Sequence, residues 1–123
     1  MELEDLEPCQ SYWYLATPYS KYFGGPEAAF EEACRVAGRF ILAGVPVYSP
    51  IVQTHPIALH AAMDPLDHKI WLPADRPLMD AAHGLVVIMM DGWGQSYGIG
   101  EEIKVFVAAG KPVLYCAHPV ELK

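Results

Sequence analysis

The chain has 123 residues, of which 53% are hydrophobic, and a formal net charge of −7. Its eight Lys and Arg residues against fifteen Asp and Glu residues argue against a nucleic-acid surface, because duplex binding depends on clustered positive charge. No apolar run reaches the ~18 residues that a membrane span needs, so we expect one cytoplasmic domain over residues 1–123.

Cysteine spacing and the N-terminal segment favour the same compartment. Cys9, Cys34 and Cys116 lie far apart and match neither a disulfide framework nor a metal site, which indicates a reducing environment. Residues 1–10 are acidic and resemble no signal peptide, and we expect them to be a frayed lead-in.

The first half of the chain begins with a strand, a helix and a second strand. Residues 12–16 are aromatic and apolar, which predicts a buried strand, and residues 17–20 end it. Pro26 stands where the first turn of a helix tolerates proline, and apolar residues then recur at helical spacing until Gly44 stops the helix. Residues 45–48 predict the second strand.

The second half alternates in the same way after an irregular stretch. Residues 51–72 show no clean period, and we expect a loop with short helices there. A helix is predicted over 75–82, the clearest buried strand over 84–90, a helix from Ser96 to Gly110 and a last strand over 112–116. This order predicts a mainly parallel sheet of four or five strands with helices on both faces, and ligands bind such sheets beyond the carboxyl ends of the strands.

The strongest local signal is the glycine-rich start of the last long helix. Backbone N–H groups around Gly98 and Gly100 can cradle an anion, because a helix begins there directly after a strand and a turn. The third glycine of a dinucleotide fingerprint is missing. The alternative interpretation is a tight turn with Ser96 as the helix N-cap, and that role is compatible with anion binding.

Two carboxylates are candidates for chemistry. Helical geometry places Glu101 in solvent near Lys104, whereas Glu102 lies on the flank of the apolar stripe, half shielded from water. The alternative for Glu102 is a simple interaction with the positive helix end. Asp75 is either the N-cap of its helix or a second carboxylate facing the first, as in glycosidic-bond cleavage.

Other polar and aromatic residues give weaker signals. His55, His60 and His68 match no standard pattern of metal ligands, so we predict no metal, and no motif indicates a cofactor. Trp71 and Trp93 are expected in loops near the site, where a ring could stack on a base or only close the end of the sheet.

Three segments carry a resemblance to a known family. Residues 14–19, 96–103 and 110–113, with Asp75 between them, resemble the nucleoside 2-deoxyribosyltransferase superfamily, especially a bacterial and phage branch of it. The serine and glycine spacing also resembles that of 2'-deoxynucleoside 5'-phosphate N-hydrolases. The resemblance covers residues 12–116 and implies a flavodoxin-like three-layer sandwich, a homodimer or larger assembly, and cleavage of an N-glycosidic bond.

The resemblance also implies roles for single residues. Glu102 matches the nucleophile, and Asp75 matches the acid that helps the base to depart. Tyr14 matches a tyrosine that orients the nucleophile, while Ser96 and Gly98 match positions around the 5' end of the sugar. Pro18, Gly100 and Trp93 complete the predicted substrate-binding set.

One departure from the family bears on the substrate. The transferases commonly carry an aspartate where this chain has Ser96, and a serine beside free helix N–H groups would accept a phosphate that an aspartate would repel. The sequence therefore predicts hydrolysis of a nucleoside 5'-monophosphate, or transfer of its (deoxy)ribosyl group. Two alternatives are a non-catalytic nucleotide-binding or sensing module, and a structural or interaction protein with a degenerate pocket.

Overall fold

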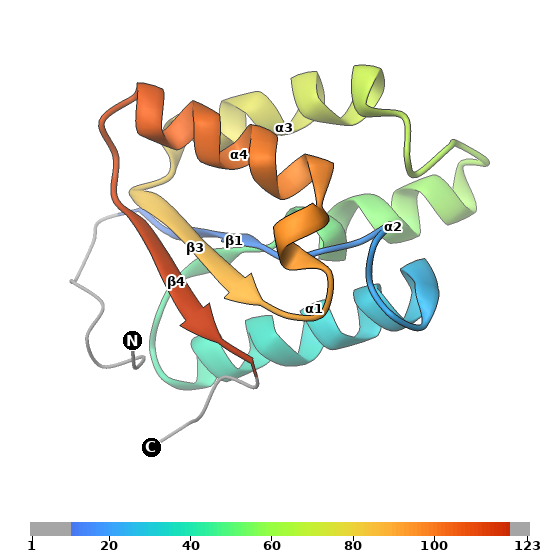
Figure 1. Ribbon diagram of the computed structural model, residues 1–123, viewed down its shortest axis with the longest axis horizontal. Helices are drawn as coiled ribbons and strands as arrows, with labels where there is room; N and C mark the ends of the chain where they lie inside the picture. Colours follow the sequence, from blue (N-terminus) through green and yellow to red (C-terminus); the bar gives the residue numbers. More distant parts are fainter. Residues whose placement is uncertain (1–10, 119–123) are drawn as a thin grey trace.

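A parallel sheet forms the centre of the computed structural model, which describes residues 11–118 (Figure 1). Its four strands lie in the order β2-β1-β3-β4, and every neighbouring pair is parallel. The strands are β1 (Trp13–Ala16), β2 (Val47–Tyr48), β3 (Gly84–Met89) and β4 (Val113–Ala117). The predicted lead-in, residues 1–10, lies outside the described residues.

Helices cover both faces of the sheet and confirm the predicted α/β architecture. α3 and α4 lie side by side on one face, and α1 lies on the other (Figure 1). The helices are α1 (Gly25–Leu42), α2 (Pro50–His60), α3 (His68–Ala81) and α4 (Tyr97–Ala108), with a short 3-10 helix, η2 (Trp93–Gln95), before α4. The layers are those of a flavodoxin-like three-layer sandwich.

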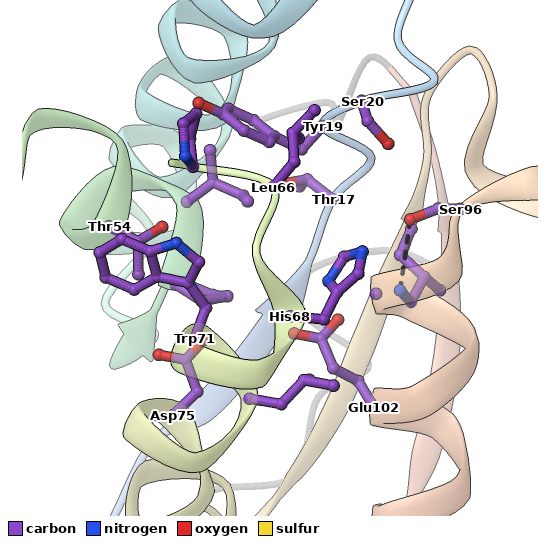
Figure 2. A pocket seen from close by; sticks show the side chains of 16 residues that line it. Thr17, Tyr19, Ser20, Thr54, Leu66, His68, Trp71, Asp75, Ser96 and Glu102 are labelled. Atoms are coloured by element: carbon purple, nitrogen blue, oxygen red, sulfur yellow. Dashed lines mark hydrogen bonds between the residues drawn. The ribbon is translucent and has the colours of Figure 1, made fainter. Parts of the chain in front are cut away.

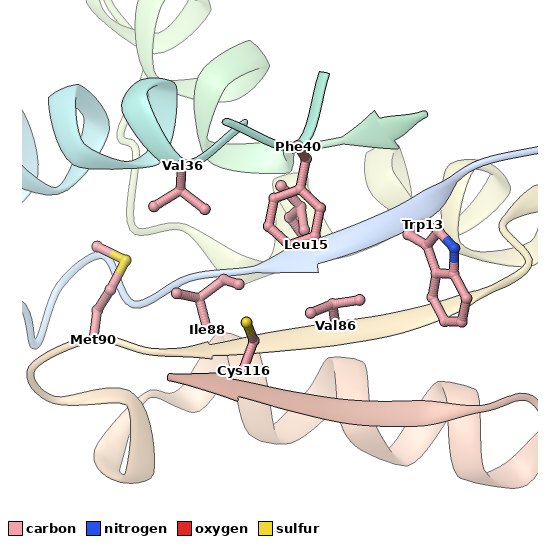
Figure 3. Close-up of a cluster of buried hydrophobic side chains, with 8 residues drawn as sticks. All are labelled: Trp13, Leu15, Val36, Phe40, Val86, Ile88, Met90 and Cys116. Atoms are coloured by element: carbon pink, nitrogen blue, oxygen red, sulfur yellow. The ribbon is translucent and has the colours of Figure 1, made fainter. Parts of the chain in front are cut away.

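Strand β1 divides its side chains between the two cores. Successive residues of a strand point to opposite faces, so Trp13 and Leu15 join the cluster with Val36 of α1 (Figure 3). Tyr14 and Ala16 join the cluster beneath α3 and α4. All four are buried, as expected for a central strand covered on both faces.

The segment between β2 and β3 differs from the prediction. Residues 51–72 are mostly helical, and α3 begins at His68 rather than at Asp75. The Asp67 side chain caps α3 by accepting from the Lys69 N–H at 3.1 Å, and Asp75 lies inside the helix, so the N-cap interpretation of Asp75 was wrong.

Prolines explain why the sequence did not predict helices α2 and α3 at their full length. Pro73 and Pro77 both lie inside α3, and Pro56 lies inside α2. A proline lacks the N–H that an interior helical residue donates and usually ends a helix, so the sequence indicated loops here. Both helices nevertheless form and bury residues on one face, so the favourable packing of that face exceeds the cost of the missing backbone hydrogen bonds.

Lys111 fixes the C-terminal end of α3 against the loop that precedes β4. Its Nζ donates to three backbone carbonyl oxygens, those of Met79 at 3.2 Å, Asp80 at 2.5 Å and Ala82 at 2.8 Å. These carbonyls lie at the negative end of the helix dipole, where a cation is favourable. One side chain therefore holds the helix that carries Asp75.

We expect Lys111→Met to lower the free energy of unfolding by about 1–3 kcal/mol, because two partly buried carbonyl groups and one exposed carbonyl group lose a charged donor. Urea unfolding followed by circular dichroism measures this change. Lys104→Met is the matched control: Lys104 forms only an exposed ion pair with Glu101 at 3.5 Å, and its loss should stay within about 0.5 kcal/mol. Equal effects of the two substitutions would contradict the anchoring role of Lys111.

Candidate active site

A pocket lies at the carboxyl end of β1, between α2, α3 and the start of α4 (Figure 2). This is the edge where parallel α/β sheets bind ligands. Side chains from both walls reach the pocket, including His68, Trp71, Asp75, Ser96 and Glu102. Asp75 and Glu102, predicted as a catalytic pair, therefore come to the same cavity from different helices.

Helix α3 contributes one continuous face to the pocket. His68, Trp71, Leu72 and Asp75 all line it, and their spacing of i, i+3, i+4 and i+7 is that of one helical stripe. Trp71 lies on this helix rather than in the predicted loop. The stripe is readable in the sequence once Asp67 is recognised as the N-cap, and it would have identified His68 and Trp71 as site residues.

Helix α4 contributes the opposite wall. The Ser96 hydroxyl caps the helix by accepting from the Ile99 N–H at 3.3 Å, and Gly98 lines the pocket in the first turn. Glu102 lies one turn farther along and is only 7% exposed, more deeply buried than the half-shielded position that the sequence predicted. Ile99 and Phe106 pack this helix onto the sheet and so fix the position of Glu102.

The two carboxyl groups are held out of water without a positive partner. Among residues 11–118, neither Asp75 nor Glu102 forms an ion pair, and no Lys or Arg side chain lines the pocket. Burial raises the pKa of Asp75 to about 6. Burial also raises the pKa of Glu102 to about 8, and the nearby Asp75 carboxyl raises it further while a contact with Tyr14 lowers it. Near neutral pH the pair therefore holds about one proton, mainly on Glu102.

Two tyrosine hydroxyls lie beside this pair in the core. Tyr14 packs against Tyr48 and Phe106, with ring centroids 5.6 and 5.7 Å away. Neither tyrosine hydroxyl has a hydrogen bond of standard geometry to a described residue, yet Tyr14 is close enough to Glu102 to affect its pKa. We interpret this as a long or bent contact of the kind that tightens when substrate binds. Burial and nearby carboxyl groups raise the pKa of both tyrosines, which stay protonated donors.

Further buried hydroxyls gather at the ends of β1 and β2. Thr17 follows β1 and Ser49 follows β2, and both are buried with no hydrogen-bond partner in the described part of the chain. Native proteins satisfy almost all buried polar groups, so several orphaned hydroxyls at one sheet edge indicate a place built for a polar ligand.

A hydrogen-bonded chain stiffens the wall formed by α1 and α2. His55 Nε2 donates to the Glu27 carboxylate at 2.7 Å, and in the neutral imidazole Nδ1 then accepts from the Tyr19 hydroxyl at 2.5 Å. Phe30 stacks on the His55 ring, with centroids 4.5 Å apart. Tyr19 lines the pocket and is thereby held in one orientation.

Three predicted substrate-binding residues do not line this pocket. Pro18 is buried beside it, and Gly100 is exposed on the outer side of α4. Trp93 lies in η2 and packs against Tyr115 of β4, with ring centroids 5.8 Å apart. The turn after β3 directs Trp93 toward β4, which explains why its place in the sequence was a poor guide to its contacts.

Metal and membrane features are absent from the described residues. Between residues 11 and 118 no group of three His, Cys, Asp or Glu side chains could hold a metal ion. No helix there is long and apolar enough to cross a membrane.

Comparison with known proteins identifies a family, and the description of that family states no function. A family model with the description "Domain of unknown function (DUF1937)" matches residues 11–118. No curated protein matches the chain.

The raised pKa of Glu102 predicts how stability changes with pH. Its pKa rises from an ordinary 4.5 to about 8 on folding, so between these values the folded chain holds a proton that the unfolded chain has lost. Stability contributed by this group is therefore lost as pH rises through that interval. The free energy of unfolding of Glu102→Gln minus that of wild type should therefore increase between about pH 5 and pH 9, by up to about 5 kcal/mol.

Urea unfolding at several pH values measures this difference. Glu101→Gln is the matched control, because Glu101 is more exposed and pairs with Lys104 on the outer face of the same helix. Parallel stability curves for wild type and Glu102→Gln would show that Glu102 titrates normally.

Proposed function

The chain belongs to the family described as Domain of unknown function (DUF1937), and from its site we propose that it cleaves the N-glycosidic bond of a nucleoside 5'-monophosphate. The (deoxy)ribosyl group is passed to water, or to a second base as a transferase would do. Glu102 is the proposed nucleophile and Asp75 the proposed acid.

The observation that carries this proposal is the pair of buried, unpaired carboxyl groups on one cavity. Such a pair is costly for stability, since each group loses hydration and neither gains a cation. Perturbed titration of this kind clusters at functional sites. Two carboxyl groups that flank a glycosidic bond can supply a nucleophile and an acid.

The first step forms a glycosyl ester. The pair shares one proton, which lies mainly on Glu102 near neutral pH, and the reactive form is the less populated one with that proton on Asp75. In this form the Glu102 carboxylate attacks C1' while the bond from C1' to the base nitrogen breaks and its electron pair leaves with the base. Asp75 donates its proton to the departing base. Positive charge grows on the sugar ring in the transition state, and a carboxylate with little water around it stabilises that charge strongly.

The second step returns the site to its starting state. Water attacks C1' of the ester, the bond to the Glu102 oxygen breaks, and the Asp75 carboxylate takes the proton that water loses. Tyr14 donates toward Glu102 in both steps and so favours its ionised form. If a second base replaces water, the same steps transfer the sugar.

A second candidate is a nucleotide-binding module without chemistry. It is favoured by the pKa of Glu102, about 8, because a protonated carboxyl donates a hydrogen bond to a ligand and cannot attack C1'. The two candidates differ in one measurable respect: only the enzyme releases free base.

Assembly and location complete the proposal. We propose a homo-oligomer in the cytoplasm, as expected from the family resemblance and the cysteine pattern. Large apolar side chains are exposed on the single chain, among them Phe23 at 85%, Leu42 at 82% and Val107 at 63%.

Loss of base release in two variants tests the enzymatic proposal. We expect Asp75→Asn to lower kcat by about 100- to 10,000-fold, because a general acid is lost. Glu102→Gln should lower kcat at least as far, because its amide cannot form the ester. Chromatography of free base from a panel of nucleoside 5'-monophosphates measures both, and Glu101→Gln should retain wild-type turnover.

The outcomes separate the two candidates. Release of base by wild type and not by Glu102→Gln supports the enzyme. Nucleotide binding by both proteins, with base released by neither, supports the binding module. Full turnover by Glu102→Gln would remove Glu102 from the role of nucleophile.

The pH dependence of turnover should be bell-shaped. Activity needs one proton on the carboxyl pair, which gains a second proton as pH falls through about 6 and loses its last proton as pH rises through about 8. We therefore expect kcat/KM to fall below about pH 6 and above about pH 8. Tyr14→Phe removes a donor that lowers the pKa of Glu102, so both kcat and the ionised fraction should decrease. A flat profile between pH 5 and pH 9 would contradict a shared proton.

A further inference from the structure

The pocket poses an electrostatic problem for a phosphorylated ligand. The chain carries a net charge of −7, and two carboxyl groups lie in the same cavity. No Lys or Arg side chain lines that cavity, and His68 is the side chain of its described lining that can carry positive charge. A phosphate dianion in this setting is bound more strongly when a donor that can carry positive charge adds to the backbone N–H groups.

We propose that His68 is a specificity-determining residue that, together with Thr17, binds the 5'-phosphate of the ligand beside the start of α4. The inference rests on the proposed function only for the identity of the ligand, a nucleoside 5'-monophosphate. It assigns the selection of nucleotide over nucleoside to these two side chains.

The position of His68 supports this assignment. His68 is the first residue of α3, and its ring lies 4.5 Å from the ring of Tyr97, the first residue of α4. The imidazole is therefore beside the turn that contains Ser96 and Gly98, and it projects into the pocket (Figure 2). A group bound there meets the ring and the first N–H groups of α4 together.

Both ring nitrogens of His68 are available to a ligand. In the described part of the chain neither forms a hydrogen bond or an ion pair, in contrast to His55, which is bonded through both of its nitrogens.

Thr17 provides an independent observation in the same pocket. It is 5% exposed, lines the pocket at the end of β1, and its Oγ1 has no hydrogen-bond partner among the described residues. Figure 2 shows its side chain at the edge of the cavity. Burying an unpaired hydroxyl is unfavourable, and a phosphate oxygen would accept from it.

Binding measurements on matched ligand pairs test the assignment. The probes are the four 2'-deoxynucleoside 5'-monophosphates with their nucleosides, and ribose 5-phosphate with ribose, titrated calorimetrically into the full chain. We expect wild type to bind the phosphorylated member of a pair more tightly. His68→Ala should weaken that member about 10- to 100-fold and leave the other within about twofold.

Further variants separate a binding role from a structural one. His68→Gln keeps an N–H donor without charge and should recover part of the lost affinity. Thr17→Val should weaken the phosphorylated ligand and spare the nucleoside. The matched control is His60→Ala, because His60 is exposed at the end of α2 and outside the pocket. It should leave every affinity unchanged.

The outcomes test the role of His68 independently of whether the protein cleaves the N-glycosidic bond. Equal weakening of nucleotide and nucleoside by His68→Ala, or no preference of wild type for phosphate, overturns it. Ribose 5-phosphate and ribose carry no base to release, so a phosphate preference that depends on His68 in this pair upholds the inference even if no base is ever released from a nucleotide. Base release that is the same in wild type and His68→Ala at low nucleotide concentration overturns it while the enzymatic proposal stands.

Discussion

Two carboxyl groups kept from water without a cation are the constraint around which this site is organised. Asp75 comes from α3 and Glu102 from α4, and the packing of both helices onto one face of the sheet brings them to one cavity. Burial raises the pKa of each group, to about 6 and about 8. The fold tolerates this unfavourable pair, which is typical of a site shaped by function rather than by stability.

Side chains of strand β1 point alternately to the two faces of the sheet, and this alternation places Tyr14 beside the carboxyl pair. Tyr14 faces α4 because its neighbours, Trp13 and Leu15, face α1. A shift of β1 by one residue would exchange the two faces and remove the tyrosine from Glu102. Because Trp13 and Leu15 are anchored in the opposite core, packing on one side of the sheet determines a polar contact on the other.

The pocket is chemically different at its two ends. The carboxyl pair and the two tyrosines gather toward the sheet, where a carboxylate can stabilise positive charge. The start of α4 offers backbone N–H groups, and His68 stands beside it. A ligand with an anion at one end and a bond that breaks toward positive charge at the other would match both ends in one orientation.

Much of this arrangement was readable in the residues alone. Buried apolar runs identified β1 and β3, and Gly44, Gly110 and the capping serine before α4 marked helix ends, because these signals are local. The rule for parallel sheets placed the start of the helix that carries Glu102 at the ligand-binding edge. Asp75 was predicted as its partner from the chemistry of paired carboxylates and from the family resemblance. Only the tertiary structure decided the remainder. Packing maintained α3 through Pro73 and Pro77 and brought His68 to the pocket, and it buried Glu102 so fully that its pKa exceeds that of Asp75. Burial depends on neighbours that are distant in sequence, and no local pattern encodes them.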